Sequence, residues 1–299
     1  MRLAGRPSPP TPPSLLGLFG LFGPTASGKT AVAEAIARRL PGELVSADSM
    51  QAYRGLPILT NQGPGRLVGI WPLDRQGSVG EFQELAHAAI DEILAAGRTP
   101  IVVGGSGLWF RAALADIGLP PNVEPGARSR FERLYERFGA ATAHALLAAR
   151  DPRAAAQVHQ NDRKRVVRAL ELWQAGASLA PDEPRLWGDE LRHPTLVVGL
   201  DVPAEVLDAR IRARTRAMFE RGVVDEVRAA GTVVPLVLGL EAVATLPPAQ
   251  AAEEIVRATL RLASYQRKWM RRIPGIVMID GQGTPDKVAD AILQVARAR

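Results

Sequence analysis

A glycine-rich loop near the start of the chain constrains the fold more than any other feature. One stretch matches the pattern G-x-x-x-x-G-K-[ST] at every fixed position: Gly23, Pro24, Thr25, Ala26, Ser27, Gly28, Lys29 and Thr30. A short apolar run, 15–22, precedes it, and an alanine-rich segment, 31–40, follows with apolar side chains four residues apart. Strand, loop and helix in this order bind phosphate, because backbone N–H groups and a helix N-terminus face the anion. The sequence therefore predicts a phosphate loop (P-loop) in an α/β fold.

The same pattern indicates roles for two side chains. Lys29 adds a positive charge to the loop, and the hydroxyl of Thr30 can hold Mg²⁺. The alternative is a chance match in a glycine-rich loop, and the agreement of both flanking segments argues against it.

Composition limits the class of protein. The chain has 299 residues, of which 46% are hydrophobic, so it can bury a large core as one domain or as a core with an insertion. It has no cysteine, which excludes disulfides and thiolate metal sites. No apolar stretch approaches the roughly 20 residues of a membrane span. We expect a cytoplasmic protein without a signal peptide, with a disordered proline-rich tail at 1–14.

Positive charge is concentrated near the end of the chain. The formal net charge is +6, and from 255 to 279 there are six basic residues and no acidic one. One helical stripe combines Tyr265 with four of these cations: Arg257, Arg261, Lys268 and Arg272. Such a stripe is either a solvated face or a surface that binds a polyanion, and the sequence leaves both open.

Short apolar runs that alternate with helical patterns predict a parallel α/β sheet with right-handed crossovers. The expected strands are 15–22, 43–47, 100–104, 196–200 and 276–279, with a helix at 81–96. The stretch 119–192 contains no strand pattern and reads as helices only, at 127–138, 140–149 and 163–173. The expected organisation is a P-loop core in two parts, 15–118 and 193–299, with a helical insertion domain at 119–192 between them.

Three further clusters carry polar chemistry. Asp48 follows the second strand, at the edge where parallel sheets bind ligands, and its carboxylate can accept a proton, hold Mg²⁺ or cap a helix. A second glycine turn, 104–107, follows the strand at 100–104, and its alternative is an ordinary strand-to-helix turn. The third cluster, 151–171, contains His159, which is structural or faces a phosphate, followed by a helix start.

The helix of this third cluster has two distinct sides. Asn161 or Asp162 can cap it. Its apolar residues are expected to pack inward: Val166, Val167 and Leu170. Its basic residues are expected to project from the other side: Lys164, Arg165 and Arg168.

Taken in order, these stretches resemble one family, the tRNA dimethylallyltransferases, also called tRNA isopentenyltransferases. The matching segments are GPTASGKT at 23–30, SADSMQAYRG at 46–55, VGGSGLWFRA at 103–112, DPRAAAQVHQNDRKRVVRALE at 151–171, RIRARTRAMFERGVVDEVR at 210–228 and, more weakly, TLRLASYQRKWMRR at 259–272. The resemblance implies transfer of a dimethylallyl group from dimethylallyl diphosphate to N6 of adenosine 37 in tRNA, giving N6-isopentenyladenosine. The phosphate loop would then hold a diphosphate leaving group and not ATP.

The resemblance also implies a role for each site residue. Asp48 would be the general base, while Lys29, Thr30 with Mg²⁺, and Arg214 would stabilise the leaving diphosphate together with the loop amides of 23–30. Arg214 has a plain alternative as a helix-surface arginine. The residues expected to contact tRNA are Asp48, Ser49, Met50, Gln51, Ser106, Lys164, Arg165 and Arg168. The expected partners are the anticodon stem-loop and dimethylallyl diphosphate, bound by a monomer.

Two segments depart from the family pattern. After Gly55 the chain lacks the usual I-G-T-A-K-P and the following His-His, and reads differently through 56–73. At 236–241 the usual A-I-G-Y-[KR] is replaced, with Leu240 for the aromatic residue and Glu241 for the base. Two other functions stay open from the residues alone: a P-loop kinase that phosphorylates a small metabolite, and a non-catalytic nucleotide-dependent RNA-binding module.

Overall fold

The computed structural model describes residues 17–299 except 121–122, 124–125, 181–184 and 235. The described chain forms two compact units. The first runs to Asp116 and resumes at Asp189, and the second spans Ile117–Gly188. The expected limits of the insertion, 119 and 192, differ from these by two and four residues. The expected tail at 1–14 lies outside the described residues.

The core of the first unit is a parallel five-stranded sheet with the order β2-β3-β1-β4-β5. The strands are β1 (Leu18–Phe22), β2 (Gly42–Ser46), β3 (Thr99–Gly104), β4 (Thr195–Asp201) and β5 (Val277–Asp280). This confirms the predicted parallel α/β fold, although β1 starts three residues later than the apolar run at 15. The strand that carries the phosphate loop is central, between β3 and β4, so its carboxyl end has neighbours on both sides.

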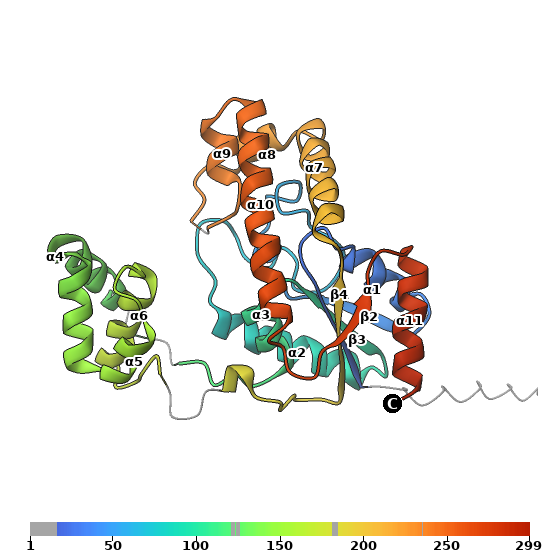
Figure 1. Cartoon of the computed structure of the whole chain (residues 1–299), viewed down its shortest axis with the longest axis horizontal. Coiled ribbons are helices and arrows are strands. Elements are labelled where there is room, and N and C mark those ends of the chain that lie inside the picture. Colours follow the sequence, from blue (N-terminus) through green and yellow to red (C-terminus); the bar gives the residue numbers. More distant parts are fainter. Residues whose placement is uncertain (1–16, 121–122, 124–125, 181–184, 235) are drawn as a thin grey trace, which may run out of the picture. The chain divides into compact units, whose positions relative to one another are not determined.

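Alternate side chains of β1 point into two separate cores, as the two-residue period of a strand requires. Leu18 and Phe22 pack with Phe110 and the apolar faces of α2 (Val79–Ala95) and α3 (Gly107–Leu114). Phe19 and Leu21 pack on the opposite face, against α1 (Lys29–Ala37) and α11 (Pro285–Arg297). Helices therefore cover both faces of the sheet (Figure 1). This burial explains why the strands read as continuous apolar runs in the sequence.

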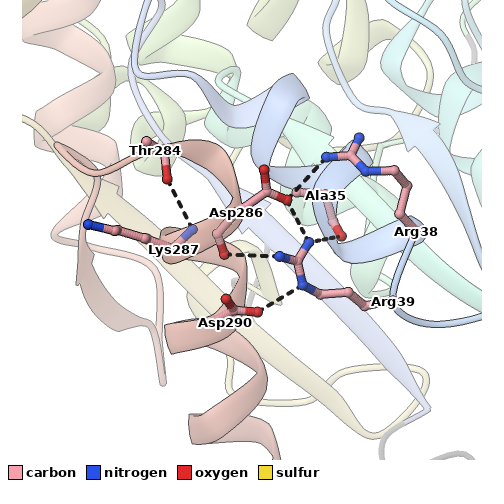
Figure 2. Close-up of polar contacts among 7 residues, drawn as sticks. All are labelled: Ala35, Arg38, Arg39, Thr284, Asp286, Lys287 and Asp290. Carbon is pink, nitrogen blue, oxygen red and sulfur yellow. Dashed lines mark hydrogen bonds and ion pairs between the residues drawn. The ribbon is translucent and has the colours of Figure 1, made fainter.

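Helices α1 and α11 are also joined by exposed ion pairs (Figure 2). The guanidinium of Arg39 donates to Asp286 and to Asp290, both at 2.8 Å, and Arg38 donates to Asp286 at 3.3 Å. The hydrogen bond from Arg39 holds the pKa of the Asp286 carboxyl below its usual value. Because all these groups face solvent, the pairs fix the register of the two helices more than they stabilise the fold.

Four helices form a further layer of the first unit (Figure 1). They are α7 (Ala204–Glu220), α8 (Val223–Ala230), α9 (Leu240–Thr245) and α10 (Pro248–Met270). Their shared core is apolar and includes Leu59, Met218, Val223 and Ile255. None of the helices in the described parts of the chain has the length and apolar character to cross a membrane.

The second unit contains α4 (Ala127–Arg150), α5 (Pro152–Gln157), α6 (Arg163–Gln174) and a 3-10 turn at Arg185–Trp187. No strand occurs among its described residues. The range of α4 contains the two helices expected at 127–138 and 140–149, and Gly139, whose φ of 82° is not helical, separates them at the predicted position. Helix α5 was not predicted. Val166, Val167 and Leu170 are buried as expected, and Asp162 caps α6 by accepting the N–H of Arg165 at 3.1 Å.

Candidate functional site

The phosphate loop connects β1 to α1 and is held in shape by hydrogen bonds between its own residues. The carbonyl of Pro24 accepts the ammonium of Lys29 at 2.8 Å and the N–H of Ser27 at 3.2 Å. Gly28 precedes α1 with a φ of 89°, a left-handed conformation that glycine adopts without steric cost. The first amides of α1 have no intrahelical acceptor, so they are available to an anion.

The loop forms one wall of a pocket of about 400 Å³ in the first unit. Its polar lining includes Lys29, Thr30, Asp48, Gln51, Arg210, Arg214 and Gln266. Its apolar lining includes Leu44, Leu59, Met218, Leu238, Ile255 and Leu262. The pocket therefore offers cationic and hydrogen-bonding groups together with hydrocarbon surface to the same ligand.

Three charged groups interact inside this pocket. Burial lowers the pKa of Lys29 from 10.5 to about 8; the charge of Asp48 opposes this shift and that of Arg214 adds to it. Burial also lowers the pKa of Arg214, again opposed by Asp48. Two desolvated cations share one carboxylate here, so the pocket has an excess of positive charge. An anionic ligand would relieve that excess.

Two buried polar atoms of the site lack a hydrogen-bond partner among the described residues. They are Nε of Arg214 and the hydroxyl of Ser27, and Ser27 is only 2% exposed. Leaving such a group unpaired costs free energy. Arg214 lines the pocket and Ser27 does not, so an acceptor supplied by a ligand is indicated for Nε of Arg214.

Thr30, the predicted magnesium ligand, lines the pocket. A Cβ at Gly63 would lie 3.0 Å from the methyl group of Thr30 and 3.9 Å from its hydroxyl, so the methyl group is the side packed against the neighbouring loop. Within the described ranges, no cluster of three or more His, Cys, Asp or Glu side chains could hold a metal ion. Mg²⁺ commonly takes one or two protein ligands and fills its shell with phosphate oxygens and water, and Thr30 fits that role.

Asp48 lies in a turn after β2, and part of its carboxylate is engaged there. Its Oδ1 accepts the N–H groups of Met50 at 2.9 Å and Gln51 at 3.4 Å. Its Oδ2 accepts no hydrogen bond from any described residue. No helix starts directly after Asp48 in this described stretch, so the helix cap considered from the sequence is wrong, and Oδ1 instead closes a turn. The second oxygen remains compatible with the role of a base.

The other residues of this segment do not all reach the pocket. Met50 and Gln51 line it, whereas Ser49 and Ser106 are not among its lining residues. The amide of Gln51 is already used inside the protein: Nε2 donates to the carbonyl of Asn61 at 2.9 Å and Oε1 accepts the hydroxyl of Ser46 at 3.2 Å. Gly23, Pro24 and Ser27 belong to the loop but lie outside the pocket lining.

Three polar groups of the site were missed by sequence reasoning. Arg210 lines the pocket and donates to the carbonyls of Ala26 and Ser27 at 3.4 Å. Gln266 of α10 contacts the phosphate loop. Glu226 accepts the N–H groups of residues 58 and 59 at 2.6 and 2.7 Å and so anchors another wall. All three lie in segments that match the family, which was the only signal available.

Comparison with known proteins decides the family. The IPP transferase family model matches residues 51–273. A tRNA dimethylallyltransferase of Salinispora arenicola is 40% identical over 92% of this chain and 85% of its own. This chain belongs to the IPP transferase family.

Solved structures agree with that assignment. A tRNA isopentenylpyrophosphate transferase from Bacillus halodurans is 30% identical, covers 93% of this chain and 95% of its own, and superposes with a TM-score of 0.63. A eukaryotic dimethylallyltransferase, described as acting on tRNA, is 23% identical over 88% of this chain and 73% of its own, with a TM-score of 0.69. The second likeness concerns the fold alone.

The predicted cationic side of α6 is smaller than expected. Lys164 and Arg165 are exposed. Arg168 does not project freely: it is half-buried and donates to Glu171 at 3.2 Å, and that carboxylate is only 2% exposed. The expectation for Arg168 was wrong because helical spacing places a residue on a side but does not identify its partner. The ring nitrogen Nδ1 of His159 accepts the N–H of Asn161 at 3.2 Å.

The basic stripe on α10 also differs from the expectation. It was predicted to lack acidic partners, yet Glu254 pairs with Arg257 at 2.8 Å and with Arg261 at 3.3 Å. Glu254 lies one residue before the window without acidic residues. Arg272 lies beyond the end of α10. Lys268 is exposed and belongs to the helix, so the continuous surface is shorter than predicted.

Proposed function

We propose that the chain transfers a dimethylallyl group from dimethylallyl diphosphate to N6 of adenosine 37 in tRNA, giving N6-isopentenyladenosine. One observation carries the proposal: a single pocket combines a phosphate loop, a hydrocarbon wall and a carboxylate. Membership of the IPP transferase family and relatives named tRNA dimethylallyltransferase support it. The comparisons give no support to a small-molecule kinase or a non-catalytic RNA-binding module.

The cationic side of the pocket suits the diphosphate. The reaction breaks the bond between C1 of the dimethylallyl group and a diphosphate oxygen, and the electron pair leaves with the diphosphate. Lys29, Arg214 and the amides that begin α1 would stabilise the growing negative charge. Mg²⁺, held by Thr30 and diphosphate oxygens, would add charge stabilisation when bound. The low pKa of Lys29 is a property of the empty pocket, and a bound polyanion would favour its protonated form.

The apolar side of the pocket suits the five-carbon chain. Leu59, Met218 and Ile255 line the same pocket as the phosphate loop. Apolar side chains around the allylic carbon exclude water, which would otherwise compete with the amine for the reactive carbon.

The acceptor is a weak nucleophile, because the lone pair of an exocyclic adenine amine is delocalised into the ring. As the bond between N6 and C1 forms, N6 must lose a proton, and Oδ2 of Asp48 would accept it. The target base must leave its stack to reach such a pocket. Exposed cations such as Lys164 and Arg165 would bind phosphates of the anticodon stem-loop. The monomeric state and the cytoplasmic location stay predictions of the sequence.

A transfer assay tests this proposal. The protein is incubated with labelled dimethylallyl diphosphate and bulk tRNA, and the tRNA is digested to nucleosides. We expect label in N6-isopentenyladenosine and none when the tRNA is omitted. Asp48→Asn should retain diphosphate and tRNA binding and lose roughly 10²–10⁴-fold in turnover. Transfer at the parent rate by Asp48→Asn would refute the base assignment, and label-free tRNA with the parent protein would refute the function.

A further inference from the structure

Gln266 joins α10 to the phosphate loop across 241 positions of the sequence. Its Oε1 accepts the backbone N–H of Thr25 at 2.7 Å. The side chain is 6% exposed and borders the pocket. A buried glutamine on a mainly apolar helix face is costly unless its amide is used, so this contact is a specific feature of the site.

The position of this amide is fixed by a second loop. A Cβ built on Gly105 would lie 2.6 Å from Nε2 of Gln266 and 3.0 Å from the carbonyl oxygen of Gly23. One helical turn further on, the ring of Trp269 occupies the space beside Gly107, where a Cβ would lie 1.9 Å from the ring. Because Gly105 and Gly107 have no side chain, α10 can pack closely against the 104–107 turn. This close packing leaves the Gln266 side chain little freedom to move.

The hydrogen bond to Thr25 fixes one peptide unit from both ends. The N–H of the Pro24–Thr25 peptide donates to Gln266, and the carbonyl of the same peptide accepts the ammonium of Lys29 at 2.8 Å. The two groups of a planar peptide point in opposite directions. Turning the N–H toward α10 therefore turns the carbonyl toward Lys29 and sets the resting place of its ammonium.

We propose that Gln266 is a positioning residue, which orients the Pro24–Thr25 peptide and thereby places Lys29 for the diphosphate. The inference rests on the proposed function only in that the loop binds a diphosphate. Gln266 acts through the loop, so this role does not require contact between Gln266 and the reacting atoms. Without the acceptor the N–H of the half-buried Thr25 loses its partner in the protein, and the peptide can rotate.

Titration with inorganic diphosphate tests the role directly. Gln266→Leu keeps the size of the side chain and removes the acceptor, so we expect roughly 5–100-fold weaker binding. In the transfer assay its KM for dimethylallyl diphosphate should rise while its KM for tRNA stays at the parent value. Gln250→Leu makes the same change at an exposed position of α10 and should bind diphosphate like the parent.

A second variant separates positioning from packing. Gln266→Glu keeps the oxygen acceptor but adds a negative charge near the ligand. Its diphosphate affinity relative to the parent should recover as the pH falls and the introduced carboxyl becomes protonated, since the neutral acid resembles the amide in shape and acceptor. Hydrogen exchange of the Thr25 amide, followed by NMR without ligand, should be faster in Gln266→Leu than in the parent, with α1 unaffected.

Parent-like diphosphate binding by Gln266→Leu would overturn the inference. So would an equal loss of diphosphate binding, tRNA binding and thermal stability, which would make Gln266 an ordinary packing residue. The proposed function fails separately: a parent protein that binds diphosphate but transfers no prenyl group would refute that function and leave the role of Gln266 intact.

Discussion

Replacing Lys29 with methionine should stabilise the empty protein and weaken its diphosphate binding. The folded state lowers the pKa of Lys29 from 10.5 to about 8 because the charged ammonium is desolvated. A difference of that size corresponds to about 3 kcal/mol. Since the side chain borders an open pocket that water enters, we expect Lys29→Met to raise the free energy of unfolding by about 1–3 kcal/mol at neutral pH.

The increase in unfolding free energy caused by Lys29→Met should become smaller as the pH rises. Below about pH 8 the residue is charged in both the folded and the unfolded state, so the parent bears the full cost. Between about pH 8 and 10.5 the unfolded chain binds more protons than the folded chain, and the parent becomes more stable as the pH rises. The difference between variant and parent should therefore shrink across that window and vanish above it.

Urea unfolding without ligand, at neutral pH and at several higher values, measures this difference. Lys287→Met is the matched control, because Lys287 is exposed on α11 and only its backbone N–H makes a contact in Figure 2. It should leave stability unchanged, while Lys29→Met should bind inorganic diphosphate roughly 10–100-fold more weakly. A lower unfolding free energy for Lys29→Met, or a gain that does not change with pH, would refute the reasoning.

Three further substitutions test the remaining contacts. Arg168→Ala should lower the unfolding free energy by up to about 3 kcal/mol, because it removes a partner of the buried Glu171 carboxylate, and urea unfolding checks this. Arg165→Ala should leave stability unchanged but weaken tRNA binding and reduce the salt slope of that binding by about 1, as measured by filter binding. Gly107→Ala should destabilise the protein by about 1–3 kcal/mol because of the ring of Trp269, as measured by calorimetry.

Local features of the molecule follow from local rules. The phosphate loop combines a sequence pattern with a left-handed glycine and a helix start, and all three are determined within ten residues. The apolar and polar sides of α6 follow from helical spacing, and its cap follows from the acceptor chemistry of Asp162. The helix α5 was missed because it has only six residues, too few for a clear periodic pattern.

Partners distant in the sequence could not be predicted in the same way. Nothing around Thr25 indicates that its N–H donates to a residue 241 positions away.

The ion-pair partner of an arginine is also missed when only the basic residues on one side of a helix are considered. Arg165 and Arg168 lie in one basic cluster of the sequence, yet one is exposed and the other pairs with a buried carboxylate. A rule for pairs three positions apart would have found Glu171, and the same rule would have found Glu254 beside Arg257.

The two departures from the family pattern show why a changed sequence can keep a pocket. In 56–62 the wall is positioned through backbone groups, because Glu226 accepts two consecutive amides, and the side chain of Leu59 supplies only apolar surface. In 236–241 Leu238 lines the pocket and Gly239 is the N-cap of α9. Contacts made by the backbone or by shape tolerate substitution, whereas the roles proposed for Asp48 and Lys29 each depend on a charged side chain. The departures therefore fall both in the pocket lining, as at Thr60, Asn61 and Leu238, and outside it, as at the 91% exposed Leu236.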